Sequence, residues 1–197
     1  MLLWVLTKLN KCLLYPPLSQ ILSLLFGLVV SASSVSTNLP PIPIEEWEAQ
    51  AGDRFIADTK ENMGYLVHED GRYAVVTIAS GRKKIVRYIG RTYDATTPIA
   101  RWNVQTKHIQ GDRVTFGKSG RFLRLYWNDA YTSYGIHSHA YIKKILASDD
   151  RFQSMGCILV DDAVMDILYE TFELNGQSLD VVTTYGLDHS LFAKTEL

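Results

Sequence analysis

The chain has 197 residues, of which 20 are Lys or Arg and 21 are Asp or Glu, so its formal net charge is −1, and 47% of its residues are hydrophobic. This composition is typical of a folded globular protein. A nearly neutral chain with no long basic run cannot neutralise a phosphate backbone, so we expect no nucleic-acid partner. The length suits one domain with an appendage, and only two cysteines, Cys12 and Cys157, exclude a disulfide scaffold.

Residues 1–34 have the composition of an export segment. Their only charged residues are Lys8 and Lys11, an apolar run follows at 21–30, and small residues come next. A basic start, an apolar centre and a small-residue site occur in this order in signal peptides. An N-terminal membrane anchor is the alternative, because the stretch 13–30 is about as long as a minimal membrane span. In either case we expect the rest of the chain to be exported to the periplasm or cell envelope.

The chain after this leader divides into a tether, one domain and a tail. Residues 35–48 are rich in Ser and Pro, a composition that favours an extended tether. Residues 49–187 contain the β-rich runs and turn signals of a folded domain. Residues 188–197 are expected to form a C-terminal tail.

Most of the domain is predicted to form short strands. The runs 65–68 and 73–79 flank Asp70-Gly71, a pair that favours the tight turn of a hairpin. Further strands are expected at 84–89, 100–104, 122–127 and 179–184. Many short strands at this spacing indicate a barrel or a sandwich.

Two stretches break the strand pattern. A helix is indicated over 161–174, where the apolar side chains recur at helical spacing, Asp161 can cap the start and Asn175-Gly176 can end it. A weaker helical pattern covers 141–147. The predicted fold class is therefore mainly β with one or two helices.

Cys157 is the only thiol left in the exported part of the chain if the leader is removed or acts as an anchor. A buried structural cysteine and an intermolecular disulfide are two interpretations. The alternative is a nucleophile, because Gly156 precedes the thiol, the stretch 148–154 is polar and a helix is predicted to begin shortly afterwards. A free thiol is mostly protonated at neutral pH, so a nucleophile would need an imidazole nearby.

Five histidines could supply that imidazole. His68 borders a turn, His108 lies in a polar stretch and His189 lies in the tail, so we expect these three on the surface. His137 ends a strand-like run, and His139 would share its face in an extended chain. Two histidines at this spacing also suit a metal, but no further Cys or His stands at ligand spacing, so we expect no metal site.

At this point the sequence resembles a known family. Gly135-Ile136-His137-Ser138, then 16 residues later Ser154-Met155-Gly156-Cys157-Ile158, resemble the catalytic motif of L,D-transpeptidases of the YkuD type. The segment 97–102 resembles the Thr-Pro segment of that family, with Ala100 in place of Gly. The resemblance covers roughly residues 54–185 and implies an L,D-transpeptidase (YkuD-like) β-sandwich or barrel catalytic domain.

The resemblance also implies the chemistry. Cys157 would be the nucleophile, His137 the base that takes its proton, and Ser138 the residue that holds this base. The substrate would be a peptidoglycan tetrapeptide stem, which the thiol opens before the terminal D-Ala to form a thioester. The family acts in cell-wall cross-linking and remodelling, can be acylated by carbapenems, and needs no cofactor.

The substrate-binding part of the motif departs from the family. The resemblance implies that Ser154, Met155 and Gly156 line this part, with backbone N–H groups of Gly156 and Cys157 as oxyanion donors. Met155, however, stands where the family usually has a His, and Leu159 stands where Asn or Arg is common. One lost oxyanion donor can cost about 10²–10³ in rate. We hypothesise that His139 replaces the missing donor.

Three functions remain open from the sequence. The first is an L,D-transpeptidase. The second is an L,D-carboxypeptidase of the same fold, in which water resolves the thioester. The third is a catalytically impaired peptidoglycan-binding protein, which the substitutions at Met155 and Leu159 favour and which the retention of Cys157 and His137 opposes.

Overall fold

The computed structural model of the chain describes residues 40–88 and 90–193. The predicted signal peptide or anchor at 1–34 and the first part of the predicted tether lie outside these ranges. Within them, none of the helices is long and apolar enough to cross a membrane.

The described chain is built mainly from short strands. In chain order its elements are η2 (Ile44–Glu46), β1 (Arg54–Asp58), β2 (Met63–Val67), β3 (Tyr73–Thr77), β4 (Ser80–Gly81), β5 (Ile85–Tyr88), β6 (Arg91–Asp94), β7 (Ala100–Ile109), β8 (Arg121–Trp127), β9 (Ala130–His137), α1 (Ile142–Leu146), β10 (Phe152–Ser154), β11 (Ile158–Leu159), α2 (Asp162–Leu174), β12 (Leu179–Thr184) and η3 (His189–Phe192). The prediction of a mainly β fold with two helices is confirmed.

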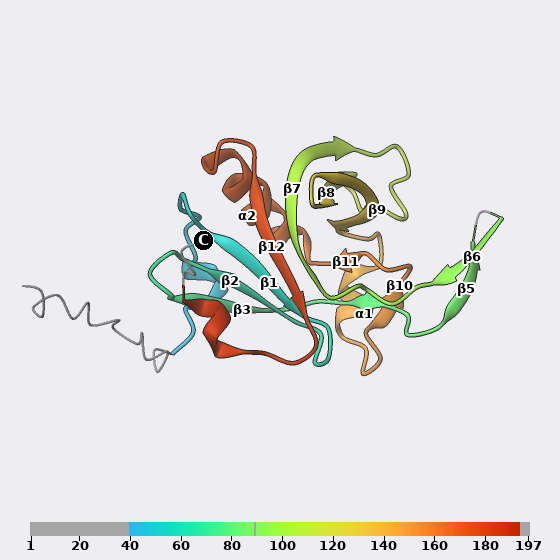
Figure 1. The fold of residues 1–197 in the computed structure, drawn as a ribbon, viewed down its shortest axis with the longest axis horizontal. Coiled ribbons are helices and arrows are strands. Elements are labelled where there is room, and N and C mark those ends of the chain that lie inside the picture. Colours follow the sequence, from blue (N-terminus) through green and yellow to red (C-terminus); the bar gives the residue numbers. More distant parts are fainter. Residues whose placement is uncertain (1–39, 89, 194–197) are drawn as a thin grey trace, which may run out of the picture. The chain divides into compact units, whose positions relative to one another are not determined.

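In the described part, one sheet of 8 strands forms the body of the domain, in the order β11-β9-β8-β7-β12-β1-β2-β3. Most neighbours are antiparallel, but β1 pairs in parallel with β12 and β11 pairs in parallel with β9. The sheet is curled, with β8 and β9 bending away from the β1–β3 part, and the β5–β6 hairpin projects as an arm (Figure 1). The curl gives the β8–β9–β11 end of the sheet a concave side.

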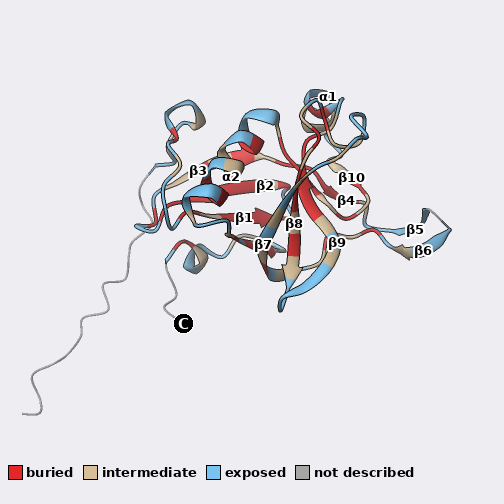
Figure 2. Ribbon diagram, turned by 90° about the horizontal axis from the view of Figure 1, so that it is seen from above, coloured by how far each residue is buried: buried red, intermediate tan, exposed pale blue. Residues whose placement is uncertain are grey.

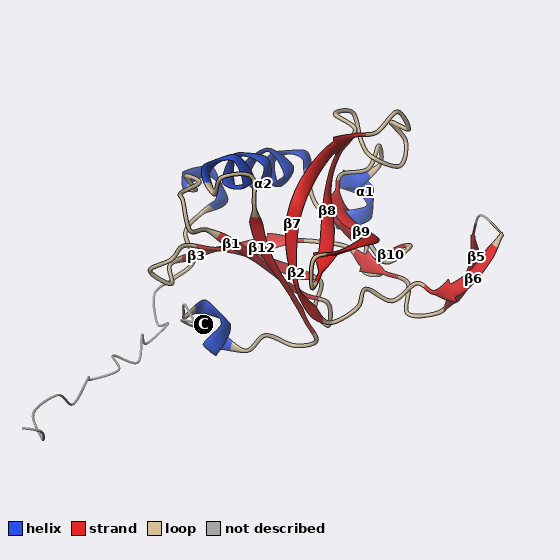
Figure 3. Cartoon of the chain, turned by 45° about the horizontal axis from the view of Figure 1, so that its top comes forward, coloured by secondary structure: helices blue, strands red, loops and turns tan. Residues whose placement is uncertain are grey.

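Helices cover both faces of the β1–β2 part of the sheet, α2 on one face and η3 on the other (Figure 3). Successive residues of β1 alternate between these faces. Phe55 belongs to the core that includes Leu168 and Phe172 of α2, whereas Ile56 packs with Phe192 of η3. Both faces of β1 are therefore buried, as Figure 2 shows.

The longer helix, α2, begins and ends where the sequence predicts. The Asp161 carboxylate accepts the N–H of Ala163 at 3.1 Å, and Gly176 has a φ of +68° just beyond the last turn. Its apolar stripe faces the sheet, with Val164 and Leu168 among the buried residues. The cap and the stripe together fix its length and its buried face.

The predicted hairpin is also confirmed. β2 and β3 pair in an antiparallel register, and the N–H of Gly71 donates to the carbonyl of His68 at 3.0 Å. Gly71 has a φ of +87°, which is the conformation that glycine adopts at no steric cost. Some strands were not predicted, because β10 and β11 are only 3 and 2 residues long and carry no periodic pattern of their own.

Both ends of the described chain pack on the domain. Ile42 forms a bridge with Ala74, and Trp47 is only 7% exposed. At the other end Phe192 is fully buried, and the Arg54 guanidinium donates to its carbonyl at 2.8 Å. The described parts of the predicted tether and tail, residues 40–48 and 188–193, therefore contact the domain through these side chains.

The predicted surface position of His68 is wrong, and that of His189 is confirmed. His68 is only 3% exposed because its ring stacks on Trp47 with 3.9 Å between the ring centroids. His189 is exposed. His108 lies in strand β7 rather than in a loop and is half-buried, with its Nε2 at 3.0 Å from the Thr106 hydroxyl.

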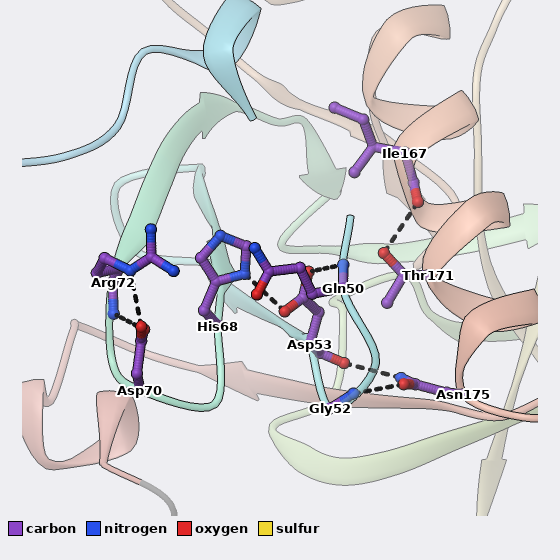
Figure 4. A network of polar contacts seen from close by, with 9 residues as sticks. All are labelled: Gln50, Gly52, Asp53, His68, Asp70, Arg72, Ile167, Thr171 and Asn175. Atoms are coloured by element: carbon purple, nitrogen blue, oxygen red, sulfur yellow. Dashed lines mark hydrogen bonds and ion pairs between the residues drawn. The ribbon is translucent and has the colours of Figure 1, made fainter. Parts of the chain in front are cut away.

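A buried polar network joins the start of β1 to the hairpin and to α2 (Figure 4). His68 Nδ1 donates to the Asp53 carboxylate at 2.7 Å, and the same carboxylate accepts the N–H of Gln50 at 2.8 Å. The Asn175 amide donates to the Asp53 carbonyl at 3.0 Å and accepts the N–H of Gly52 at 2.7 Å. Because these groups are satisfied within the fold, the network ties three elements together at low cost in desolvation.

We expect Asp53→Ala to lower the free energy of unfolding by about 3–5 kcal/mol, because it leaves the buried His68 without its partner. Denaturant unfolding measures this change. The matched control is Asp70→Ala, which breaks the exposed Asp70–Arg72 pair of the same hairpin and should cost at most about 1 kcal/mol. Equal losses in the two variants would contradict the importance of the buried pair.

Candidate active site

A pocket of about 1400 Å³ opens at the β8–β9–β11 end of the sheet, on the face opposite the core. It is lined by side chains from the β5–β6 arm, from β8 and β9, from the loop before β11 and from the α1 region. Among the predicted site residues, its lining includes His137, His139, Ser154, Met155 and Cys157. The fold therefore brings both halves of the sequence motif to one pocket.

Strand pairing explains why the two halves meet. β11 runs parallel to β9, with Leu159 paired to His137 and Ile158 paired to Ile136. Paired residues share a face and neighbours along a strand alternate, so Cys157, two residues before Leu159, falls on the face of His137. Ile136 and Ile158 point to the opposite face and are fully buried in the core. The alternation thus separates a core face from a pocket face.

The pairing of β8 with β9 contains an irregularity that shapes this pocket. Arg124 pairs with Gly135 and Tyr126 with Tyr131, so three residues of β9 stand opposite Leu125 alone. Bulges of this kind bend a strand and are frequent beside active sites. Here the carbonyl of Thr132 accepts a hydrogen bond from Arg124 at 2.7 Å. The carbonyl of the next residue, Ser133, faces the Cys157 thiol at 4.0 Å.

The loop that carries Cys157 is held by hydrogen bonds to its backbone. The Ser154 hydroxyl donates to the carbonyl of Cys157 at 2.6 Å, and the Thr97 hydroxyl donates to the carbonyl of Gly156 at 3.0 Å. Gly156 has a φ of +112°, and a Cβ there would lie 2.6 Å from the Tyr134 ring. Only glycine fits this position, because a side chain would meet both backbone strain and the ring.

The N–H of Gly156, an oxyanion donor according to the resemblance, has a partner inside its own loop. It donates to the Ser154 hydroxyl at 3.1 Å, so in this conformation it does not point free into the pocket as an oxyanion donor. Of the two N–H groups that the resemblance implies, this leaves that of Cys157. Ser154 thus holds the loop by two hydrogen bonds and also lines the pocket.

His137 ends β9 and is only 4% exposed. Its ring packs against Phe116 and Phe122, with centroids 4.9 and 5.8 Å away, and its Nδ1 donates to the carbonyl of Ser138 at 2.6 Å. Burial lowers the pKa of His137 to about 4, with hydrogen bonds to backbone carbonyls acting the other way. The imidazole is therefore neutral at pH 7, and a proton on Nδ1 leaves the lone pair on Nε2.

Ser138 contacts the base through its backbone. The Ser138 residue is fully buried, and its hydroxyl has no hydrogen-bond partner in the described structure. The carbonyl, not the hydroxyl, is the group that orients His137. Replacing the side chain while keeping the backbone would therefore leave this hydrogen bond intact.

Cys157 is half-buried at the edge of the pocket. Burial raises the pKa of the thiol to about 11, although a backbone hydrogen bond from Gly135 and the positive charge of Arg124 lower it. The thiol points to the Ser133 carbonyl, and no hydrogen bond joins it to His137 in the described structure. The free site therefore holds a neutral thiol and a neutral imidazole rather than an ion pair.

His139 and Leu159 also reach the pocket. Because β9 ends at His137, His139 does not continue the strand as predicted; its Nδ1 accepts the N–H of Tyr141 at 3.1 Å. An accepting Nδ1 leaves the proton on Nε2, so a neutral His139 carries a free N–H donor. Leu159 places an apolar side chain beside His137 on the pocket face.

Sequence reasoning missed Arg124. It lies on the pocket face of β8 and lines the pocket. The alternation of β8, in which Leu123 and Leu125 point to the core, is the signal that could have revealed it. Among the described residues, no three His, Cys, Asp or Glu side chains gather closely enough to hold a metal ion.

Comparison with known proteins places this site in a family. A sequence model of the L,D-transpeptidase catalytic domain, YkuD, matches residues 52–182. Since this match covers well over half of the chain, the protein belongs to the L,D-transpeptidase catalytic domain family. A search of curated proteins finds no match.

Several solved structures are similar at low identity. They include the L,D-transpeptidase from Xylanimonas cellulosilytica, with 21% identity, a TM-score of 0.49, and coverage of 70% of this chain and 63% of that one. The L,D-transpeptidase from Mycobacterium smegmatis has 14% identity, a TM-score of 0.48, and coverage of 68% and 59%. The ertapenem-acylated catalytic domain from Enterococcus faecium L,D-transpeptidase has 18% identity, a TM-score of 0.46, and coverage of 70% and 100%. The chain thus spans less than two thirds of the first two proteins.

The pKa of the thiol predicts how the reactivity of Cys157 depends on pH. Its alkylation by iodoacetamide should rise about tenfold per pH unit from pH 7 towards 10, because only the thiolate reacts. Peptide mass spectrometry measures modification at Cys157 separately from Cys12. N-acetylcysteine, with an ordinary thiol pKa, is the control and should level off earlier. A rate for Cys157 that is already constant between pH 6 and 8 would contradict the neutral pair.

Proposed function

We propose that this protein is an L,D-transpeptidase that acts on peptidoglycan tetrapeptide stems through a thioester at Cys157. The observation that carries the proposal is the shared pocket face of the β9–β11 pair, which bears His137 and Cys157 together. The family match over residues 52–182 supports the same conclusion. An imidazole base on the same pocket face as a thiol can activate that thiol for acyl transfer.

In the first half of the proposed reaction, the Cys157 thiol turns from the Ser133 carbonyl toward the imidazole and attacks the carbonyl carbon before the terminal D-Ala. Nε2 of His137 takes the thiol proton as the C–S bond forms. The tetrahedral intermediate then collapses, the C–N bond breaks, and His137 returns the proton to the leaving amine. D-Ala departs and the stem remains bound to Cys157 as a thioester.

In the second half, an acceptor amine attacks the thioester and gives its proton to His137. The C–S bond breaks, the new peptide bond forms and the thiol recovers its proton. The Cys157 thiol and the His137 imidazole both start neutral, so the thiol must lose its proton as it attacks. His137 therefore serves as a general base rather than as half of a preformed ion pair.

Two donors are proposed to stabilise the oxyanion. One is the N–H of Cys157, and the other is the Nε2–H of His139, whose Nδ1 is occupied by Tyr141. The hydrogen bond from Tyr141 thus supports the hypothesis that His139 replaces the donor that Met155 cannot supply. Ser154 and Gly156 contribute by fixing the loop that carries the thiol.

We expect Cys157→Ala to abolish both ertapenem acylation and D-Ala release from tetrapeptide stems, because it removes the nucleophile. His137→Ala should slow acylation by about 10²–10⁴, the usual contribution of a positioned general base. Intact-mass analysis and D-Ala quantification measure the two effects, and ertapenem is chosen because it acylates the Enterococcus faecium domain. The exposed His189→Ala is the matched control and should leave both rates unchanged.

The same assays separate the alternatives. A cross-linked product in the presence of a second stem supports the transpeptidase, whereas D-Ala release without any cross-linked product supports an L,D-carboxypeptidase. If the wild-type protein neither releases D-Ala nor gains the mass of ertapenem, both enzymatic functions fail. Binding to peptidoglycan would then favour the catalytically impaired peptidoglycan-binding protein.

We also propose that the catalytic domain lies outside the cytoplasmic membrane, in the periplasm or cell envelope. The support is the leader composition of residues 1–34 together with the location of the proposed substrate. Cell fractionation should recover the protein in the periplasmic or membrane fraction, the latter favouring an anchor. Recovery of the full-length chain as a soluble cytoplasmic species would refute this localisation.

A further inference from the structure

The pocket has a strongly one-sided charge. Arg82, Arg91, Arg124 and Lys144 all line it, whereas no Asp or Glu is found among the lining residues of the described chain. Such a lining favours a ligand that carries carboxylates, because the cations attract it and it supplies the missing counter-charge.

Arg124 is the cation on the same sheet face as the proposed catalytic pair. It pairs with Gly135 on β9, and the Phe122 ring, over which the guanidinium lies, fills the space that a side chain at Gly135 would need. Its charge acts on Cys157, lowering the pKa of the thiol. These observations place the guanidinium near the reacting sulfur.

The Arg124 guanidinium is held in place, but not all of its N–H groups have hydrogen-bond partners. Nη1 donates to the Thr132 carbonyl at 2.7 Å, and the guanidinium carbon lies 4.5 Å from the Tyr131 ring centroid and 4.9 Å from that of Phe122. Its Nε is buried and has no hydrogen-bond partner in the described structure. None of the described carboxylates forms an ion pair with Arg124. Because Nε is not exposed, a bound carboxylate would pair with the Nη groups, of which the described structure gives a protein partner only to Nη1.

We propose that Arg124 binds a carboxylate of the substrate, namely the free carboxylate of the terminal residue that leaves as the thioester forms. The choice of this carboxylate rests on the proposed function. In a stem peptide it is separated from the attacked carbonyl carbon only by the scissile nitrogen and one further carbon, so a cation beside the thiol can reach it. A fork of N–H donors also fixes the orientation of a carboxylate.

This proposal also accounts for Leu159. The family resemblance leads one to expect a polar Asn or Arg at that position, two residues after the thiol, whereas this chain has an apolar side chain. Leu159 on β11 and Arg124 on β8 line the same pocket from the same face of the sheet, on either side of β9. The polar group missing from β11 is thus supplied by β8.

The first test uses two small alkylating agents that differ only in charge, iodoacetate and iodoacetamide. The rate ratio of iodoacetate to iodoacetamide at Cys157 should fall about tenfold in Arg124→Gln, because the attraction for the carboxylate is lost. Any change in thiol pKa affects both reagents equally and cancels in the ratio. Peptide mass spectrometry at Cys157 measures both rates in the full chain, without requiring any enzymatic activity.

Two further variants complete this test. Arg121→Gln removes the same charge from the same strand, where Arg121 pairs with Asp166 outside the pocket, and should leave the ratio unchanged. Arg124→Lys keeps the positive charge and serves as a second variant if Arg124→Gln does not fold. Its rate ratio should lie between those of the wild type and Arg124→Gln. An unchanged ratio in both folded Arg124 variants would overturn the proposal.

The second test assigns the carboxylate. With a tetrapeptide that ends in D-Ala, Arg124→Gln should raise KM about tenfold, whereas with the same peptide ending in D-alanine amide it should change KM little. Equal effects on both peptides would overturn the assignment to the leaving residue. If the wild-type protein releases nothing from either peptide, the proposed function fails, and the alkylation ratio still decides whether Arg124 binds carboxylates.

Discussion

The candidate active site of this protein depends on the parallel pairing of β11 with β9. β9 ends with His137, and β11 begins directly after Cys157 and runs alongside it, so the two residues share one face of the sheet. The opposite face carries Ile136 and Ile158 into the core, which fixes the register because a slip of one residue would bury the polar face. Core packing thus positions His137 and Cys157, the proposed catalytic pair.

The same end of the sheet gains its pocket from the irregular pairing of β8 with β9. The extra residues of β9 turn the carbonyls of Thr132 and Ser133 toward the side chains of Arg124 and Cys157. In a regular strand pair, such carbonyls would accept hydrogen bonds from the backbone of the neighbouring strand. The irregular pairing therefore provides the carbonyls that position the Arg124 guanidinium and the Cys157 thiol.

Burial sets the chemical state of the free site. Desolvation lowers the pKa of His137 and raises that of Cys157, so both groups remain neutral near pH 7. A neutral thiol is less reactive toward electrophiles than a thiolate, so in the proposed reaction proton transfer accompanies the attack. The Arg and Lys side chains that line the pocket give it a positive electrostatic potential.

The sequence by itself determined much of the local structure and named the candidate site residues. The Asp-Gly turn, the cap at Asp161 and the apolar stripe of α2 depend on neighbours in the chain, so they could be predicted. The motif around His137 and Cys157 was found instead through its resemblance to a family. Only the tertiary structure decided the burial of His68, the packing of Phe192, the use of the Gly156 N–H and the position of Arg124. Each of these depends on a partner that is distant in sequence or on the register of paired strands, and no local pattern specifies such a partner.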